Sequence, residues 1–324
     1  MTANRLLIVD GLNLFIRQYV CDPSISTQGE PVGGLKGVFK SLQKVCREVK
    51  PTQIVICWDG PGGSKKKKAL VSGYKDGRNP LRLNRNVKAL TEQQEMQNRV
   101  WQQLRTFEYL NLCPITQFLF PEIEADDLVS YAARHKKYTD WVKIILSNDK
   151  DFIQLCDDKT ILMRPTQKEI LNKNSVLKEH SIHPNNFALA RSIAGDKSDN
   201  LDGIKGVGLV SLANKFSFLA EEQRYTVDDI LEKCEANKDD GKMYQNILNE
   251  KQKVYLNYQI MQLYQPSMSL QAQNKVDYVL DNFIPEFNKT DFLKSSILDG
   301  FADLNLNELF TTFNRIISDE KTAT

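Results

Sequence analysis

Three short stretches decide the fold: RLLIVD (residues 5–10), QIVICWD (residues 53–59) and VKIILS (residues 142–147). Each is of strand length and mainly apolar, and each has an acidic residue at its end or within two residues of it. A short apolar run bounded by polar residues is typical of a strand that is buried on both faces. A fourth strand of this kind is expected over residues 115–120.

Helical segments separate these strands. Residues 34–50 place Leu35, Val38, Phe39 and Leu42 on one face, and residues 91–109 and 124–136 are also expected to be helical. Strands that alternate with helices predict an α/β fold with a mainly parallel central sheet flanked by helices.

The pattern changes twice along the chain. Residues 60–99 form an insertion with a glycine-rich start and a basic middle, too long for an ordinary loop. After residue 184 the chain is expected to be helical, with helices over 185–194 and 209–216. We therefore expect an α/β domain over residues 1–184 and a helical region over 185–324.

Composition limits the class of protein. The chain has 324 residues, of which 41% are hydrophobic, and no apolar run approaches the length of a membrane span. The six cysteines form no C-x-x-C pair, so reduced thiols are expected rather than a zinc site or a disulfide framework. His180 and His183 are three residues apart, but the following Pro184 indicates a turn. We expect a cytoplasmic protein with no membrane partner.

Nine acidic residues fall in short motifs along the chain. In parallel sheets, sites form outside the carboxyl ends of the strands, where the first acids of this set are expected. Each motif alone is equally typical of a helix cap or a turn. Together they predict one site built from Asp10, Asp59, Glu124, Asp126, Asp127, Asp149, Asp151, Asp196 and Asp199.

Such a cluster requires compensation, because close carboxylates cannot all stay ionised. With only three histidines in the chain, oxygen ligands are expected, which favours two or more Mg²⁺ ions, with Mn²⁺ as a substitute. Acidic metal sites of this type hydrolyse phosphodiesters. The lysines at 65–68 lie in a basic segment that should attract a polyanion such as a nucleic acid.

The order of the motifs resembles a known family. The segments IVDGLNLF, CWDG, YKDGR, PEIEADDL, LSNDKDFIQL and AGDKSDNLDGIKGVG resemble the successive blocks of the 5′-nuclease (flap endonuclease) family over roughly two-thirds of the chain. This family includes the phage 5′–3′ exonucleases and the N-terminal nuclease domain of bacterial DNA polymerase I. The chain is most similar in organisation to the stand-alone phage type. The resemblance implies a PIN-like fold, a helical arch at about 60–99 and a helix–three-turn–helix at about 185–216.

The resemblance also implies roles for individual residues. Asp10, Asp59, Glu124 and Asp126 would form the first metal site, with Asp127 adjoining it. The second metal site would consist of Asp149, Asp151, Asp196 and Asp199.

Basic and glycine residues are implied as the nucleic-acid side of the site. Lys75 and Arg78 would be catalytic, Tyr74 would stack on a base and Arg17 would bind phosphate. The turn GIKGVG at 203–208 would bind duplex DNA and a K⁺ ion, although Val210 stands where relatives commonly have a lysine. The residues implied there are Gly203, Lys205, Gly206, Gly208 and Lys215.

The expected function is thus a metal-dependent, structure-selective 5′-nuclease that acts on branched, flapped or nicked DNA and on RNA–DNA hybrids. The resemblance also implies a task, the removal of primers or flaps during replication, and contact with replication proteins. It implies a monomer and, for a phage-encoded chain, a location in the cytoplasm of a bacterial host. Two alternatives stay open: a PIN-type ribonuclease and a non-catalytic DNA-junction binding module. The glycine turn and basic insertion argue against the first, and the complete carboxylate set argues against the second.

Overall fold

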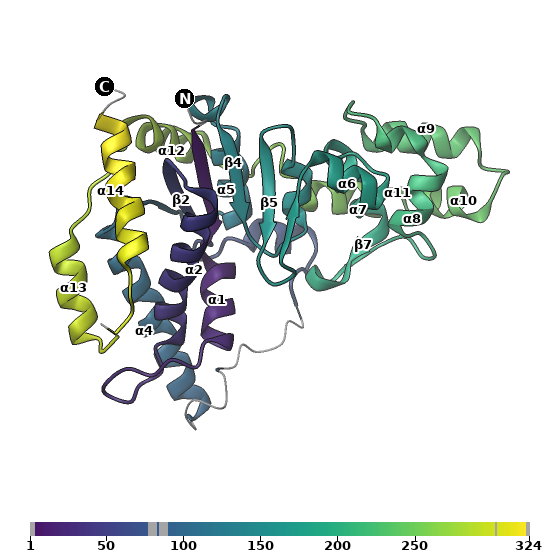
Figure 1. Ribbon diagram of the computed structural model, residues 1–324. Helices are drawn as coiled ribbons and strands as arrows, with labels where there is room; N and C mark the ends of the chain where they lie inside the picture. The colour runs from purple at the N-terminus through teal and green to yellow at the C-terminus, as the bar shows by residue number, and fades with distance from the viewer. Residues whose placement is uncertain (1–3, 77–82, 84–89, 302, 322–324) are drawn as a thin grey trace.

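The computed structural model describes residues 4–76, 83, 90–301 and 303–321. At its centre lies a six-stranded sheet in the order β3-β2-β1-β4-β5-β6 (Figure 1). The first five strands in this order are parallel, and β6 is antiparallel to β5. The strands are β1 (Arg5–Asp10), β2 (Gln53–Trp58), β3 (Thr116–Leu119), β4 (Val142–Leu146), β5 (Thr160–Arg164) and β6 (Glu169–Leu171).

The predicted α/β fold is confirmed. The four predicted strands correspond to β1, β2, β3 and β4, and the predicted helices correspond to helices that the structure contains. The sequence did not lead us to expect β5, β6 or the helix α1 (Gly11–Cys21). β5 and β6 are five and three residues long, so they carry little periodic signal.

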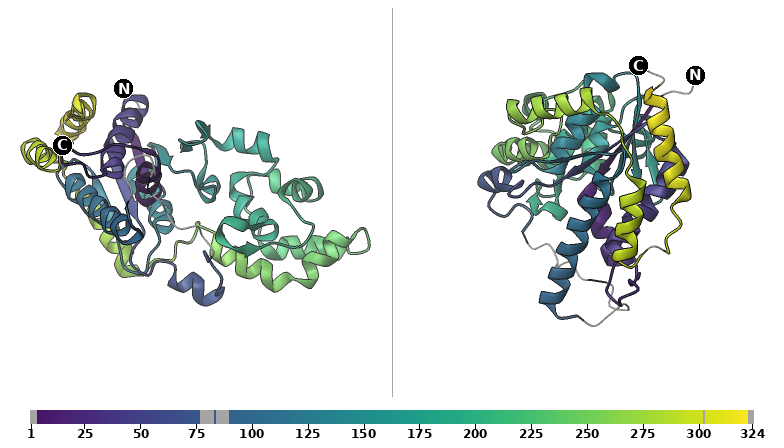
Figure 2. Two further views of the ribbon diagram at one scale, coloured as in Figure 1. Left: turned by 90° about the horizontal axis from the view of Figure 1, so that it is seen from below. Right: turned by 90° about the vertical axis from the view of Figure 1, so that its left-hand side faces the viewer.

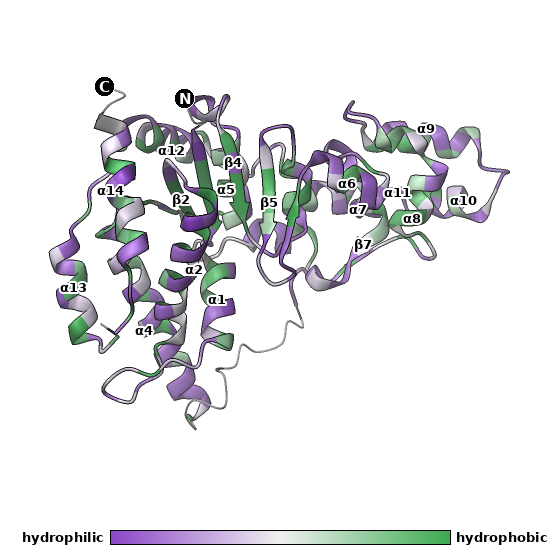
Figure 3. Ribbon diagram, viewed as in Figure 1, coloured by the Kyte–Doolittle hydropathy of each residue, from purple (hydrophilic) through white to green (hydrophobic). Residues whose placement is uncertain are grey.

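Both faces of the sheet are covered. Alternate residues of each strand point to opposite faces, so Leu7 and Val9 of β1 enter one core while Leu6 and Ile8 enter the other. Figure 3 shows the strands as mainly apolar, as expected for strands buried on both sides. The first face packs on α1, α2 (Gly33–Val49), α4 (Glu92–Asn111), α13 (Lys289–Leu298) and α14 (Asn307–Lys321).

The other face carries α5 (Ala125–Ala133) and α12 (Leu270–Asn282) and continues into a mainly helical part. This part lies beside β5, on the side of the sheet away from α13 and α14 (Figures 1 and 2). Its helix α7 (Pro184–Ala194) packs on the 3-10 helix η2 (Asp151–Leu155) that follows β4. It contains α6 (Lys173–His180), α7 (Pro184–Ala194), the two-residue strands β7 (Gly195–Asp196) and β8 (Leu201–Asp202), α8 (Leu209–Lys215), α9 (Val227–Ala236), α10 (Lys242–Asn249) and α11 (Lys251–Met261).

The C-terminal helices return to the sheet. α12 contacts β3, α14 contacts α2, and Phe292 of α13 is fully buried among Phe39, Tyr109 and Phe310. The division at residue 184 therefore remains a prediction about domains. In space, the helices α12, α13 and α14 lie against the α/β part. In the described part of the chain, no helix is long and apolar enough to span a membrane.

Phe292→Ala should lower the free energy of unfolding by about 3–5 kcal/mol, because it removes a buried ring from an aromatic cluster. Urea unfolding followed by circular dichroism measures this loss. Ile297→Ala on the same helix is the matched control: its side chain is 66% exposed, and a change within about 0.5 kcal/mol is expected. A small, equal loss for both variants would show that α13 does not unfold together with the sheet.

Candidate metal centre

The carboxyl ends of the central parallel strands deliver acidic side chains to one place. Asp10 ends β1 and caps α1, where its Oδ1 accepts a hydrogen bond from the Asn13 N–H (3.1 Å) and its Oδ2 accepts one from the Ser147 hydroxyl (2.9 Å). Asp59 follows β2 and accepts a hydrogen bond from the Ala125 N–H at the start of α5 (3.0 Å). Strand ends and backbone N–H groups at helix starts thus hold both carboxylates in place.

These acids line a cleft with a volume of ≈ 650 Å³. Asp10, Asp59, Asp126 and Asp149 share it, although the family resemblance placed Asp149 in the second metal site. Arg17 and Lys75 line the same cleft, so its acidic floor is bordered by positive charge. Asn13, Asn148 and Arg99 also line it and were not expected from the sequence.

The carboxylates in the cleft are held in an unfavourable electrostatic state. Burial raises the pKa of Asp10 to about 7, and the negative charge of Asp59 adds to the effect. Burial, together with the charge of Asp149, raises the pKa of Asp126 well above its ordinary value, and burial also raises the pKa of Asp149. Divalent cations would relieve this repulsion, and all the available ligands are oxygen atoms, which suits Mg²⁺ or Mn²⁺.

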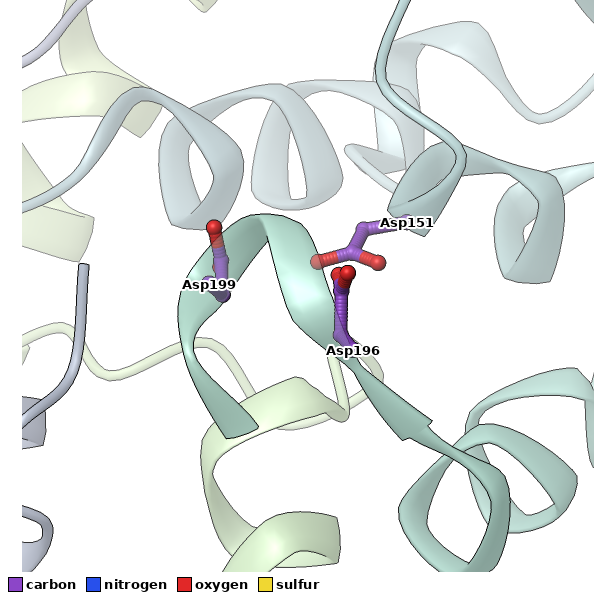
Figure 4. A group of neighbouring side chains, drawn as sticks. All are labelled: Asp151, Asp196 and Asp199. Atoms are coloured by element: carbon purple, nitrogen blue, oxygen red, sulfur yellow. The ribbon is translucent and has the colours of Figure 1, made fainter. Parts of the chain in front are cut away.

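A second acidic cluster lies next to the first. Carboxylate oxygens of Asp151, Asp196 and Asp199 all lie within 4.8 Å of one another (Figure 4). The Asp151 N–H donates to Asp149 Oδ1 (2.9 Å), so the two clusters are joined through the NDKD turn. Burial raises the pKa of Asp151 to about 7, and the charge of Asp149 contributes. Arg191 of α7 pairs with both Asp151 and Asp196.

Glu124 and Asp127 are placed differently from the other acids. Glu124 is 2% exposed and pairs with Lys75 Nζ (2.7 Å) and Lys67 Nζ (2.5 Å). Burial alone would raise its pKa, but the two ammonium groups outweigh burial and the pKa of Glu124 is lowered. Asp127 accepts a hydrogen bond from the Ser267 N–H (2.7 Å), which ties α5 to the segment before α12.

Lys67 is a residue of this site that sequence reasoning missed. It lies in α3 (Lys65–Leu70), and its side chain is 13% exposed, compared with 70% for Lys65 and 44% for Lys68. A run of four lysines does not indicate which one faces inward. Only the packing of α3 against Glu124 distinguishes Lys67 as part of the site rather than of a general basic surface.

The other basic and aromatic residues can be placed in part. Lys75 has a positive φ of 59°, and its N–H donates to the Asp199 carbonyl (2.9 Å), so its backbone lies beside the second cluster. Tyr74 is only 2% exposed and packs on Leu201, Ile260 and Met261, so its ring is not open to a base in this conformation. Arg78 lies outside the described residues, as does most of the middle of the expected arch.

The glycine turn has the geometry of a tight connection. A Cβ atom on Gly203 would lie 2.1 Å from the Ala194 carbonyl oxygen, so only glycine fits there. Gly206 has a φ of 79°, and nothing lies within 4 Å of a Cβ atom on Gly206 or Gly208. Lys205 and Lys215 are exposed, so both are accessible to a ligand.

The sequence of this chain is similar to those of known exonucleases and DNA polymerases. The model of the family described as "5′-3′ exonuclease, N-terminal resolvase-like domain" matches residues 5–181. A 5′-3′ exonuclease of Aquifex aeolicus is 28% identical over 208 residues, which are 63% of this chain and 65% of the relative. The thermostable DNA polymerase I of Thermus aquaticus is 29% identical over 205 residues, 63% of this chain but 23% of the relative. The match thus spans less than two-thirds of either relative.

Among solved structures, the bacteriophage T5 flap endonuclease in a complex with DNA and metal ions has the same fold. Its TM-score is 0.63 at 18% identity, and the match covers 93% of this chain and 100% of that one. The fold is that of an α/β domain with an acidic edge of its parallel sheet. The chain belongs to the 5′-3′ exonuclease family, whose model covers more than half of its length.

Without metal, Asp10→Asn should stabilise the fold by about 1–3 kcal/mol near pH 8. The folded-state pKa of about 7 lies above the ordinary 3.8, so the stability associated with Asp10 is present at low pH and is lost as pH rises through about 7. Thermal unfolding in EDTA at about pH 5 and about pH 8 measures this difference. The exposed Asp140→Asn is the control and should change stability little. An Asp10→Asn protein that is less stable near pH 8 would contradict the account.

Proposed function

We propose that this protein is a divalent-metal-dependent 5′-nuclease that acts as a flap endonuclease and 5′–3′ exonuclease. The observation that carries the proposal is the pair of adjoining carboxylate clusters at the carboxyl edge of the parallel sheet, bordered by Lys75 and Arg17. A metal-binding floor and a cationic border together suit a phosphodiester, which brings its own negative charge.

The residues present fit divalent ions. Asp10, Asp59, Asp126 and Asp149 would hold the first, and Asp151, Asp196 and Asp199 the second, with Asp149 adjoining both groups. When bound, such ions lower the pKa of a water and stabilise the attacking and leaving oxygens of phosphodiester hydrolysis. Mg²⁺ is the proposed ion and Mn²⁺ the substitute.

Glu124 remains a proposed first-site residue, although lysines are its partners in this structure. Lys67 and Lys75 neutralise Glu124, and a phosphate oxygen would compete for the same ammonium groups. The role proposed for Lys75 is therefore to hold the scissile phosphate and stabilise its developing charge, with Arg78 as its partner. Asp127 has a positioning role through Ser267.

The nucleic-acid contacts are proposed at two places, the cleft and the glycine turn. Arg17 would bind phosphate in the cleft, and the turn with Gly203, Gly206 and Gly208 would approach duplex backbone, with a K⁺ ion there. Exposed Lys205 and Lys215 would add electrostatic contacts in place of the lysine that Val210 replaces. Tyr74 would have to leave its apolar contacts to stack on a base.

The proposed substrates are flapped, nicked or otherwise branched DNA and RNA–DNA hybrids, cut near their 5′ ends. Removal of RNA primers or flaps in replication is the proposed task, in a phage-type, monomeric protein that works in the cytoplasm of a bacterial host beside replication proteins. The Aquifex relative is named a 5′-3′ exonuclease, and the Thermus relative is a DNA polymerase, which supports a task of this kind.

One assay tests the function. A labelled 5′ flap, a nicked duplex, an RNA–DNA hybrid and a single-stranded RNA are each incubated with and without Mg²⁺. Cleavage of the flap and nicked DNA only with Mg²⁺ is expected. Preferred cleavage of single-stranded RNA would favour a PIN-type ribonuclease, and binding without cleavage would favour a junction-binding module.

Asp149→Asn should slow flap cleavage by more than about a hundredfold, because it removes a carboxylate shared by the neighbouring clusters. DNA affinity, measured by fluorescence anisotropy in Ca²⁺, should change by a few-fold at most. Cleavage at the wild-type rate would remove Asp149 from the metal centre.

Lys75→Ala should slow single-turnover cleavage by about 10²–10³-fold while leaving DNA binding nearly unchanged. The matched control is Lys68→Ala, whose ammonium pairs with Asp76 at the surface instead of with Glu124. Equal losses of cleavage and binding in the Lys75 variant would make Lys75 a simple electrostatic contact.

A further inference from the structure

Arg191 has no counterpart in the predicted site, yet it lies in the centre of the second acidic cluster. It projects from α7 and is 8% exposed. Its Nη2 atom is 3.2 Å from Asp151 Oδ1 and also forms a hydrogen bond with Asp196 Oδ2. These two carboxylates, with Asp199, are those whose oxygen atoms converge within 4.8 Å.

The contact geometry of Arg191 is unlike that of an arginine selected to hold two elements together. Structural arginines commonly bind a carboxylate with two parallel N–H groups, which adds geometric specificity. Here one nitrogen serves both carboxylates, and the buried Nε has no hydrogen-bond partner among the described residues. The guanidinium therefore acts on the cluster largely as a single positive charge between two oxygens.

Electrostatics supports this view. The guanidinium of an arginine keeps its positive charge in proteins, and here that charge contacts the carboxylates of Asp151 and Asp196. A divalent ion that is to bind both Asp151 and Asp196 must take oxygens that Arg191 already occupies. Binding of that ion therefore has to break charge-assisted hydrogen bonds in a buried place, which lowers its affinity.

We infer that Arg191 is an internal counter-ion that competes with the divalent metal of the second cluster and sets the affinity of that site below that of the first. In the metal-free protein it holds Asp151 and Asp196 together against their repulsion. It yields these carboxylates when metal binds. This inference rests on the proposed metal-dependent function and names the residue that regulates one of its two sites.

Mn²⁺ alone is the probe, and free Mn²⁺ is measured by electron paramagnetic resonance without DNA or cleavage. The wild type should show a tighter and a weaker class of site, and Asp196→Asn should remove the weaker one. Arg191→Met, which keeps the length and apolar stem of the side chain, should tighten the weaker class by about 10- to 100-fold. The tighter class should not change.

Arg105→Met is the matched control, because Arg105 also bridges two carboxylates, those of Asp299 and Glu108, away from the acidic cleft. It should leave both Mn²⁺ affinities unchanged. An Arg191→Met protein with unchanged or weaker Mn²⁺ binding overturns the inference, whereas a wild type that binds no Mn²⁺ overturns the proposed function itself.

The wild type supplies a second measurement if Arg191→Met does not fold without metal. In a protein with ¹⁵N-labelled arginine, the Nε–H signal of Arg191, assigned from an Arg191→Lys spectrum, should shift as Mg²⁺ fills the weaker class. The Arg105 signal should stay in place. An Arg191 signal that does not move at saturating Mg²⁺ overturns the inference.

Discussion

Repulsion between buried carboxylates at one edge of the parallel sheet is the constraint on which the rest of the structure depends. The strand ends place Asp10, Asp59 and Asp149 together, and burial raises the pKa of Asp10 to about 7. Most of the unusual contacts around them supply positive charge or hydrogen-bond donors. Backbone N–H groups at the starts of helices donate to Asp10 and Asp59, two lysines bind Glu124 and one arginine binds Asp151 and Asp196.

This constraint separates two kinds of element in the protein. The sheet and its buried helices form a stable support that includes the C-terminal helices α13 and α14, which pack on α2 and α4. The helical part beside β5 contributes Arg191, Asp196 and Asp199, so the second cluster is completed only when that part packs on η2. The geometry of the second acidic cluster therefore depends on packing between α7 and η2, whereas that of the first depends mainly on the sheet.

Much of the fold and of the acidic site could be predicted from the sequence, because short, mainly apolar stretches and the acids that follow them are local signals. What could not be predicted depends on side-chain direction and on distant partners. Asp126 and Asp127 are neighbours, but successive helical residues differ by about 100° in direction, so one faces the cleft and the other bonds Ser267. Lys67 and Arg191 reach carboxylates far away in sequence, and Tyr74 is buried by residues from two later segments.

Anomalous diffraction from crystals grown with Mn²⁺ tests the central claim most directly, because it locates the ions without reference to activity. The account predicts one peak among Asp10, Asp59, Asp126 and Asp149, and a second among Asp151, Asp196 and Asp199, each about 2.2 Å from carboxylate oxygens. Peaks confined to surface acids such as Asp228 and Asp229, with none in the cleft, would contradict it.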